Sequence, residues 1–244
     1  MKKSWICVVG VSLALSVAGC GKSGSSEYKP VAPKEPETVT VSPGQESILF
    51  PTTVGNRWTY DSVSEAVAPN GMIRTPATIT LEVKANTPAD ANGIARATVE
   101  VSKGEVLQDR QIWAFKSDGV FQEQIGLDKP QKPDPMQLTI PFPLEKDKPV
   151  AWKGKAMGAT GTVVDIDQEV INKGPEDVDT IVGMLNAYRV ETTQRFKVKE
   201  NDVTVTNIAW WAPKIGLVRY KQEVKVGARK LQMQTLMLKQ YTVK

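Results

Sequence analysis

Thr78-Ile79-Thr80-Leu81-Glu82-Val83-Lys84 alternates polar and apolar side chains. Successive side chains of a strand point to opposite faces of a sheet, so this alternation predicts a strand with one buried face and one solvated face. Ahead of it lies Asn70-Gly71, a pair that tolerates positive φ and is typical of a tight hairpin turn. A second turn at residues 90–93 is followed by alternate apolar residues at 95–101, which predict the next strand.

The same pattern continues along the chain. Further strands are expected at 107–116, 119–125, 160–172, 185–199, 202–212, 217–226 and 229–243. No segment shows the 3.6-residue spacing of an amphipathic helix. The expected fold is therefore all-β: about ten antiparallel strands in a meander, curled into a half-barrel, a barrel or a sandwich, because flat sheets of that width are unfavourable.

Six prolines between Lys129 and Pro149 interrupt the pattern. Proline cannot donate a ladder hydrogen bond, so this stretch cannot hold a central strand. It is either a long crossover or the joint between two related β halves, 48–128 and 140–244. Phe50-Pro51 and Phe142-Pro143 each precede a strand-rich region, which favours halves, and chance in an aromatic-poor sequence is the alternative.

The amino terminus has the features of a secretory signal covering residues 1–19. Two lysines are followed by an apolar stretch at 6–17, and about a dozen apolar residues are too few to span a bilayer. Val17-Ala18-Gly19-Cys20 resembles a bacterial lipobox. In that motif cleavage falls between Gly19 and Cys20, and the cysteine thiol is then acylated, often together with the new amino terminus.

Acylated Cys20 would be the membrane anchor, since two or three acyl chains bind durably where one anchors only marginally. Residues 20–47 lack apolar periodicity and predict a disordered tether, which leaves 48–244 as the β-rich domain. Gly21 in place of Asp resembles the enterobacterial rule for outer-membrane delivery, so the expected location is the outer membrane, facing the periplasm. With Cys7 removed and Cys20 acylated, no thiol remains for a disulfide or a zinc site.

Charge and composition exclude several functions. Removing Lys2 and Lys3 with the signal leaves 29 basic against 27 acidic residues, too weak a field to favour nucleic acid as a partner. Histidine is absent from the sequence, as are the nucleophile elbow, the phosphate loop and the dinucleotide fingerprint. We therefore expect no cofactor and no enzymatic activity, with a hydrolase based on carboxylates or a Ser–Lys pair as the alternative.

Asp165, Asp167 and Glu169 alternate and so share one strand face, where their oxygens could hold calcium. Apolar residues occupy the other face, which equally suits a solvated strand exterior. Because the spacing of a calcium-binding loop is missing, we expect no metal site here.

Two basic faces are the other candidates for binding. They consist of Arg195, Lys197 and Lys199, and of Arg219, Lys221 and Lys225. If adjacent, they could bind an anionic headgroup, lipopolysaccharide or acidic polysaccharide. The alternative is that edge lysines oppose strand-to-strand aggregation.

Five tryptophans could line an apolar or sugar-binding groove, or simply pack in a β core: Trp58, Trp113, Trp152, Trp210 and Trp211. Since Trp210 and Trp211 are adjacent in an expected strand, their side chains should face opposite sides of the sheet.

Three short blocks resemble a family of bacterial envelope lipoproteins with no established activity. They are Leu49-Phe50-Pro51 with residues 54–60, residues 182–190, and residues 210–218. The chain departs from the family pattern at Lys214, where glycine is usual, and at Val182-Gly183-Met184. The resemblance implies a mostly β fold. A more distant similarity is to half-barrel carriers that move lipoproteins across the periplasm, although those carriers close their barrels with helices.

The expected function is that of a membrane-anchored envelope lipoprotein with a non-enzymatic β-domain. Such a domain would act as a binding or assembly module for an envelope protein or a polyanionic glycan or lipid. An apolar cavity above roughly 300 Å³ would instead favour a periplasmic carrier of lipids or lipoproteins. Convergent carboxylates with raised pKa values would favour the hydrolase. The oligomeric state is left open.

Overall fold

The computed structural model describes residues 40–42, 44–157 and 163–244. Within them the chain forms twelve strands and a short 3₁₀ helix, η1 (Glu46–Leu49). The strands are β1 (Arg57–Ala68), β2 (Gly71–Thr87), β3 (Ala95–Lys103), β4 (Val106–Lys116), β5 (Gly119–Ile125), β6 (Gln137–Pro141), β7 (Pro149–Met157), β8 (Val163–Thr180), β9 (Gly183–Val198), β10 (Asn201–Ala212), β11 (Gly216–Val226) and β12 (Arg229–Thr242). The all-β, antiparallel expectation is confirmed, with twelve strands where about ten were expected. No helix in this part of the chain is both long and apolar enough to cross a membrane.

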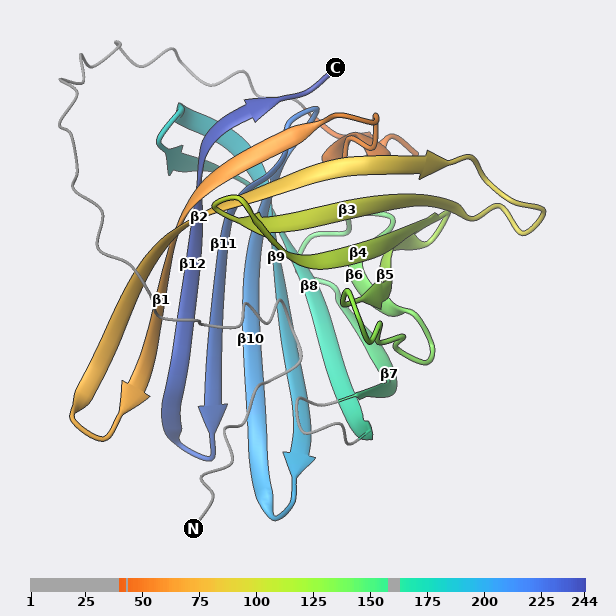
Figure 1. The fold of residues 1–244 in the computed structure, drawn as a ribbon. Coiled ribbons are helices and arrows are strands. Elements are labelled where there is room, and N and C mark those ends of the chain that lie inside the picture. The colour runs from red at the N-terminus through yellow and green to blue at the C-terminus, as the bar shows by residue number, and fades with distance from the viewer. Residues whose placement is uncertain (1–39, 43, 158–162) are drawn as a thin grey trace, which may run out of the picture.

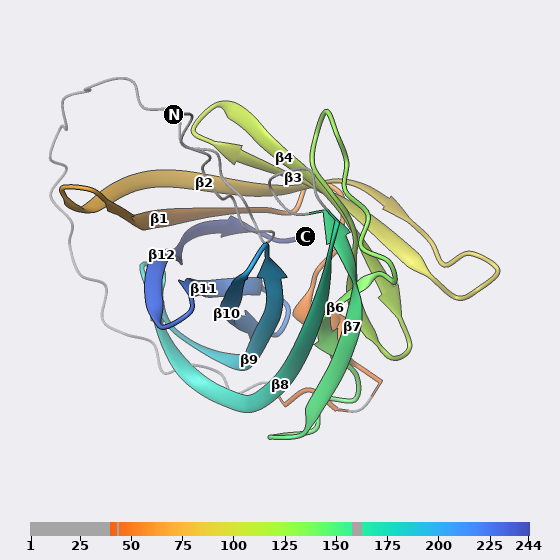
Figure 2. The same cartoon turned by 90° about the horizontal axis from the view of Figure 1, so that it is seen from below.

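All of these strands belong to one antiparallel sheet, in the order β6-β5-β4-β3-β2-β1-β12-β11-β10-β9-β8-β7. The sheet consists of two meanders, β1–β6 and β7–β12, joined where the first and last strands pair. In Figure 1 the long strands β8–β12 run beside β1, while β3 and β4 cross one end. Seen from below, the sheet curls until its edge strands β6 and β7 approach each other (Figure 2). The architecture is therefore a nearly closed barrel.

The proline-rich stretch forms the seam of this barrel. It contains β6, which lies at the sheet edge, where the missing donors of proline are tolerated. Asp134 and Lys155 exchange two backbone hydrogen bonds of 2.9 and 2.7 Å across the seam. Farther along, the backbone N–H of Asp147 donates to the carbonyl of Asn172 at 2.7 Å. The stretch thus gives hydrogen-bond partners to backbone N–H and C=O groups at the sheet edges, which could otherwise pair with a strand of another chain.

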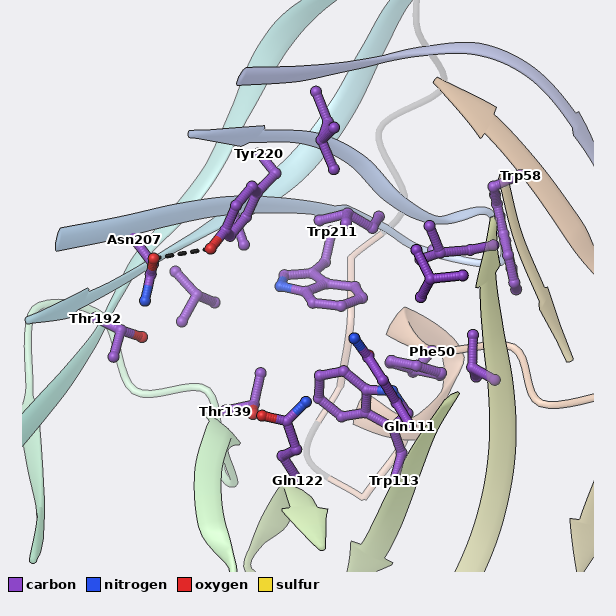
Figure 3. A pocket seen from close by; sticks show the side chains of 18 of the residues that line it. Phe50, Trp58, Gln111, Trp113, Gln122, Thr139, Thr192, Asn207, Trp211 and Tyr220 are labelled. Carbon is purple, nitrogen blue, oxygen red and sulfur yellow. Dashed lines mark hydrogen bonds between the residues drawn. The ribbon is translucent and has the colours of Figure 1, made fainter. Parts of the chain in front are cut away.

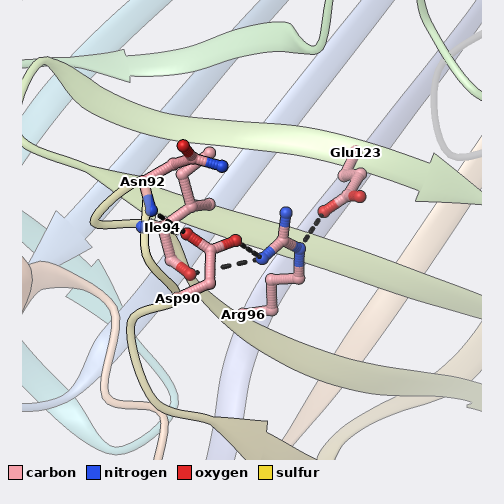
Figure 4. Close-up of polar contacts among 5 residues, drawn as sticks. All are labelled: Asp90, Asn92, Ile94, Arg96 and Glu123. Atoms are coloured by element: carbon pink, nitrogen blue, oxygen red, sulfur yellow. Dashed lines mark hydrogen bonds and ion pairs between the residues drawn. The ribbon is translucent and has the colours of Figure 1, made fainter.

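The turn expected at residues 90–93 is organised by one carboxylate (Figure 4). The Asp90 side chain accepts the backbone N–H groups of Asn92 (2.8 Å) and Ile94 (3.2 Å). Arg96 donates to Asp90 at 2.8 Å and to Glu123 of β5 at 2.7 Å, bridging across β4 on the outer face. The hydrogen bond from Arg96, with those from the backbone, lowers the pKa of Asp90. This polar cluster therefore shapes the turn between β2 and β3.

The segment before β1 packs against the barrel. Phe50 is buried, the Lys214 N–H donates to the Ile48 carbonyl (2.8 Å), and the Val41 N–H donates to the Tyr188 hydroxyl (3.0 Å). Contacts with the barrel thus begin ahead of residue 48, where the folded domain was expected to start. Lys214 has φ 63°, in the left-handed region that glycine adopts most readily, so lysine is strained at this position.

Candidate ligand-binding cavity

The curled sheet lines a partly open cavity of about 140 Å³ (Figure 3). All of its lining side chains are uncharged, and they come from Phe50-Pro51 and from eleven of the strands, all but β7. Phe50 lies against Trp113 and Trp211, with ring centroids 5.2 and 5.4 Å apart. Figure 3 shows these rings together, with Thr192 and Asn207 across the cavity. The cavity is therefore aromatic in one part and polar in another.

Strand periodicity places the lining residues. On β10, Asn207, Ala209 and Trp211 alternate onto the inner face, which spans roughly 13 Å of strand at 3.3 Å per residue. Trp210, between them, faces outward, where the guanidinium groups of Arg219 and Arg189 lie 5.4 and 5.9 Å from its ring centroid. The two adjacent tryptophans thus occupy opposite faces of one strand, as the alternation requires.

Glutamine is unusually common in the interior. Six glutamines, each on a different strand, are at most 6 % exposed: Gln111, Gln137, Gln168, Gln194, Gln222 and Gln234. Burying an amide costs free energy unless it is hydrogen-bonded. The side-chain amide of Gln168 on β8 is hydrogen-bonded across the seam. Its Oε1 accepts from Gln137 Nε2 (2.9 Å) and Gln194 Nε2 (3.1 Å). Its Nε2 donates to the Leu138 carbonyl (2.6 Å). Side-chain amides thereby join β6, β8 and β9.

Two buried tyrosines keep the interior neutral. Tyr60 donates its hydroxyl hydrogen to the Leu217 carbonyl at 2.9 Å, and burial raises the pKa of this phenol. Tyr220 donates to Asn207 Oδ1 at 2.8 Å, and burial raises the pKa of Tyr220 against the opposing effect of the Gln222 hydrogen bond. Both side chains are therefore protonated donors at physiological pH.

Two polar atoms at the cavity are buried and have no hydrogen-bond partner within the described part of the chain: the indole Nε1 of Trp211 and the Oε1 of Gln194. The other cavity tryptophans are satisfied, since Trp58 donates to the Ile215 carbonyl (2.5 Å) and Trp113 to Gln111 Oε1 (3.1 Å). A buried group left unpaired costs roughly 1–3 kcal/mol. A molecule in the cavity could relieve that cost.

The acidic trio lies outside the barrel. Asp165 and Asp167 are exposed, Glu169 is half-buried, and Lys153 pairs with Asp167 at 2.8 Å. No group of three or more metal-ligating side chains occurs among the residues the structure describes. The three carboxylates therefore lie on the outer face of the strand, the position that the sequence analysis gave as the alternative to a calcium site.

The two basic faces lie on one outer surface, separated by β10. Across it, Arg195 and Lys225 both pair in register with Thr204. Acidic residues interrupt the surface: Lys197 lies 3.6 Å from Asp202. The half-buried Arg219 stacks on Trp210, Lys221 is also half-buried, and Lys199 is an exposed turn residue. The structure thus brings the faces together without forming a continuous positive patch.

Glu223 further reduces the charge of this surface. It pairs with Lys230 (2.5 Å) and Lys225 (2.9 Å), and these hydrogen bonds, led by the one from Lys230, lower the pKa of Glu223 to about 2. The carboxylate is therefore ionised at neutral pH and offsets the neighbouring lysines.

Gly19, Cys20 and most of the expected tether lie outside the described residues. Of the five tryptophans proposed to line an apolar groove or to pack in the core, three line the cavity: Trp58, Trp113 and Trp211. The buried amides of the cavity were not predicted. One signal was available: Gln168 shares a strand face with the buried Ile166 and Val170, where an apolar residue would be expected. A buried amide in that position indicates an interior polar network rather than a simple apolar core.

A solved structure shares this fold. A candidate lipoprotein from Parabacteroides distasonis matches with a TM-score of 0.50 and 12% identity, over 80% of this chain and 98% of its own. A candidate exported protein with a YmcC-like fold from Bacteroides fragilis matches with a TM-score of 0.47 and 13% identity, over 79% and 98%. No protein-family model and no curated protein sequence matches the chain. At such low identity the likeness concerns the fold alone.

Proposed function

We propose that this chain is a membrane-anchored lipoprotein of the cell envelope whose β-domain binds a small apolar molecule, or the apolar end of a larger one. The observation that carries the proposal is the uncharged, aromatic-lined cavity of about 140 Å³. An apolar cavity of about 150 Å³ accommodates a benzene-sized molecule. Because pockets for larger ligands start near 300 Å³, a binding module is favoured over a carrier that encloses a whole lipid.

The anchor in this proposal is acylated Cys20, at the outer membrane and facing the periplasm. The lipobox-like Val17-Ala18-Gly19-Cys20 supports acylation, and Gly21 after the cysteine supports outer-membrane delivery. The similarly folded Parabacteroides protein is itself described as a candidate lipoprotein. Domain and membrane would be linked by the residues after Cys20.

The anchor is tested by intact mass and membrane fractionation of the expressed protein beside a Cys20→Ser variant. We expect the wild type in the membrane fraction, with the mass of a chain that begins at Cys20 plus acyl groups. The variant should lack acyl mass and leave the membrane or stay unprocessed. A soluble wild type without acyl mass would refute the anchor and the location that depends on it.

Cavity binding is tested by tryptophan fluorescence, using bromobenzene as a benzene-sized apolar quencher. Trp58, Trp113 and Trp211 line the cavity, whereas Trp210 lies on the outer face. Bromobenzene should quench the mature chain, with serine in place of Cys20, in a saturable manner. Trp211→Phe should remove a substantial part of the saturable quenching, because the heavy atom acts on rings that it contacts.

Trp210→Phe is the matched control, since it changes the neighbouring residue on the opposite face of β10. It should lower the total emission but leave the saturable quenching and its midpoint unchanged. Quenching of the wild type that rises linearly without saturation, or that both variants reduce equally, would show that bromobenzene does not occupy the cavity.

A further inference from the structure

We propose that the cavity recognises an uncharged amphiphile, a hydrocarbon chain bearing a hydroxyl or amide group, and that Gln194 selects it by accepting a hydrogen bond from that group. This inference rests on the proposed function and adds the chemistry of the ligand. It follows from the absence of charge in the cavity lining and from the orientations of three amides.

Among the described residues, the cavity lining offers no ionic partner to a ligand. All of its lining side chains are uncharged, and its phenols, Tyr60 and Tyr220, remain protonated because burial raises their pKa values. A carboxylate, phosphate or ammonium group held there would lose its hydration without gaining an opposite charge. The buried part of the ligand is therefore neutral.

The orientation of Gln194 follows from its neighbours. A backbone carbonyl can only accept, so the Leu138 carbonyl at 2.6 Å must face the amide nitrogen of Gln168. The oxygen of Gln168 then faces Gln194 at 3.1 Å, and Gln194 must turn its nitrogen toward it. The remaining Gln194 oxygen has no partner among the described residues and is buried at the cavity. What it lacks is a donor, so a hydrocarbon, ether or ester cannot satisfy it.

Trp211 adds a second requirement. Its indole N–H is a donor only, and it has no acceptor within the described part of the chain. Gln194 of β9 pairs in register with Val205 of β10. Trp211 lies six residues farther along β10, a distance of roughly 20 Å. The two unpaired atoms therefore serve different parts of the cavity, and the polar group of a small ligand reaches one of them at a time. A hydroxyl or an amide can provide both kinds of partner.

The test compares two isomers by isothermal titration calorimetry on the mature chain with serine in place of Cys20. Hexan-1-ol and butyl ethyl ether contain the same atoms, and the oxygen of either can accept a hydrogen bond, but only the alcohol can donate one to Gln194. We expect the alcohol to bind about tenfold more tightly, the value of one hydrogen bond to an otherwise unpaired buried acceptor. Hexanoate at pH 7 should bind at least tenfold more weakly than the alcohol.

Gln194→Met keeps the side-chain length but removes the acceptor, so it should bring the two affinities within about twofold while preserving binding of the ether. Gln234→Met is the matched control: Gln234 is also buried but does not line the cavity, and the tenfold preference should persist. Equal affinities of the isomers for the wild type, or preferred binding of hexanoate, would overturn this inference and leave the proposed function standing. No binding of either isomer together with no saturable bromobenzene quenching would refute both.

Discussion

Replacing Phe50 with alanine is expected to lower the free energy of unfolding by roughly 3–5 kcal/mol, the range for removing a buried phenylalanine ring. Phe50 is only 8 % exposed and contacts three aromatic rings, those of Trp113, Phe115 and Trp211, at centroid distances of 5.2 to 5.4 Å. The substitution would remove the ring that holds the segment before β1 against the barrel. It would also enlarge the cavity at its aromatic end, because Phe50 is part of the lining.

Urea unfolding followed by circular dichroism measures this loss. Phe142→Ala is a suitable control: Phe142 also precedes a proline, but it is only partly buried and is not part of the cavity lining. Its replacement should cost less than half as much. Equal losses for the two variants would mean that Phe50 contributes ordinary surface packing and does not hold the amino-terminal segment in place.

Replacing Gln168 with leucine is expected to cost roughly 3–5 kcal/mol, because it leaves two donors and one acceptor unpaired at about 1–3 kcal/mol each, less some relaxation. The orphaned groups are the amide nitrogens of Gln137 and Gln194 and the carbonyl of Leu138. Leucine is similar in size, so the loss would come from the hydrogen bonds and not from a void. Since these bonds cross the seam, β6 should separate from β8.

Hydrogen exchange distinguishes this result from a uniform loss of stability. In Gln168→Leu the amides of β6 and of the proline-rich stretch should exchange faster, while those of β10 and β11 follow the global stability. Gln234→Leu, a buried glutamine on β12 away from the seam, is the control and should leave β6 protected. If β6 stays protected in Gln168→Leu, the backbone bonds between Asp134 and Lys155 are sufficient to hold the seam.

Much of the local structure could be predicted from the chain itself. The alternation in residues 78–84 lies within β2, and the hairpin at Asn70-Gly71 joins β1 to β2. Alternation of polar and apolar residues predicts a strand because successive side chains point to opposite faces of the sheet. The prolines of the 129–149 stretch exclude a central strand for a similarly local reason, and β6, which was not expected, lies at the sheet edge. The lipobox at Cys20 is also a local motif, and acylation there stays a prediction.

Other features required the tertiary structure. β1 pairs with β12, the last strand of the chain, and no local pattern encodes which distant strands become neighbours. β7 (Pro149–Met157), next to the proline-rich stretch, was not expected as a strand, and the seam that this stretch closes could not be foreseen. The alternation groups each set of basic residues on one strand face, but only the register shows that β10 and its acidic neighbours separate the two faces.

The cavity most clearly belongs to the tertiary structure. Gln137 and Gln168 are 31 residues apart, and Gln168 and Gln194 are 26 apart, yet the three share one network across the seam. The sequence by itself determined most of the strands and their apolar faces, because those properties depend on neighbours along the chain, and it predicts where the chain is acylated. Only the curl of the sheet decided which inward side chains meet. It left the Trp211 N–H and the Gln194 oxygen without partners among the described residues at the cavity. The physical reason is that hydrogen bonds between side chains depend on distances in space, and these are fixed by the nearly closed barrel.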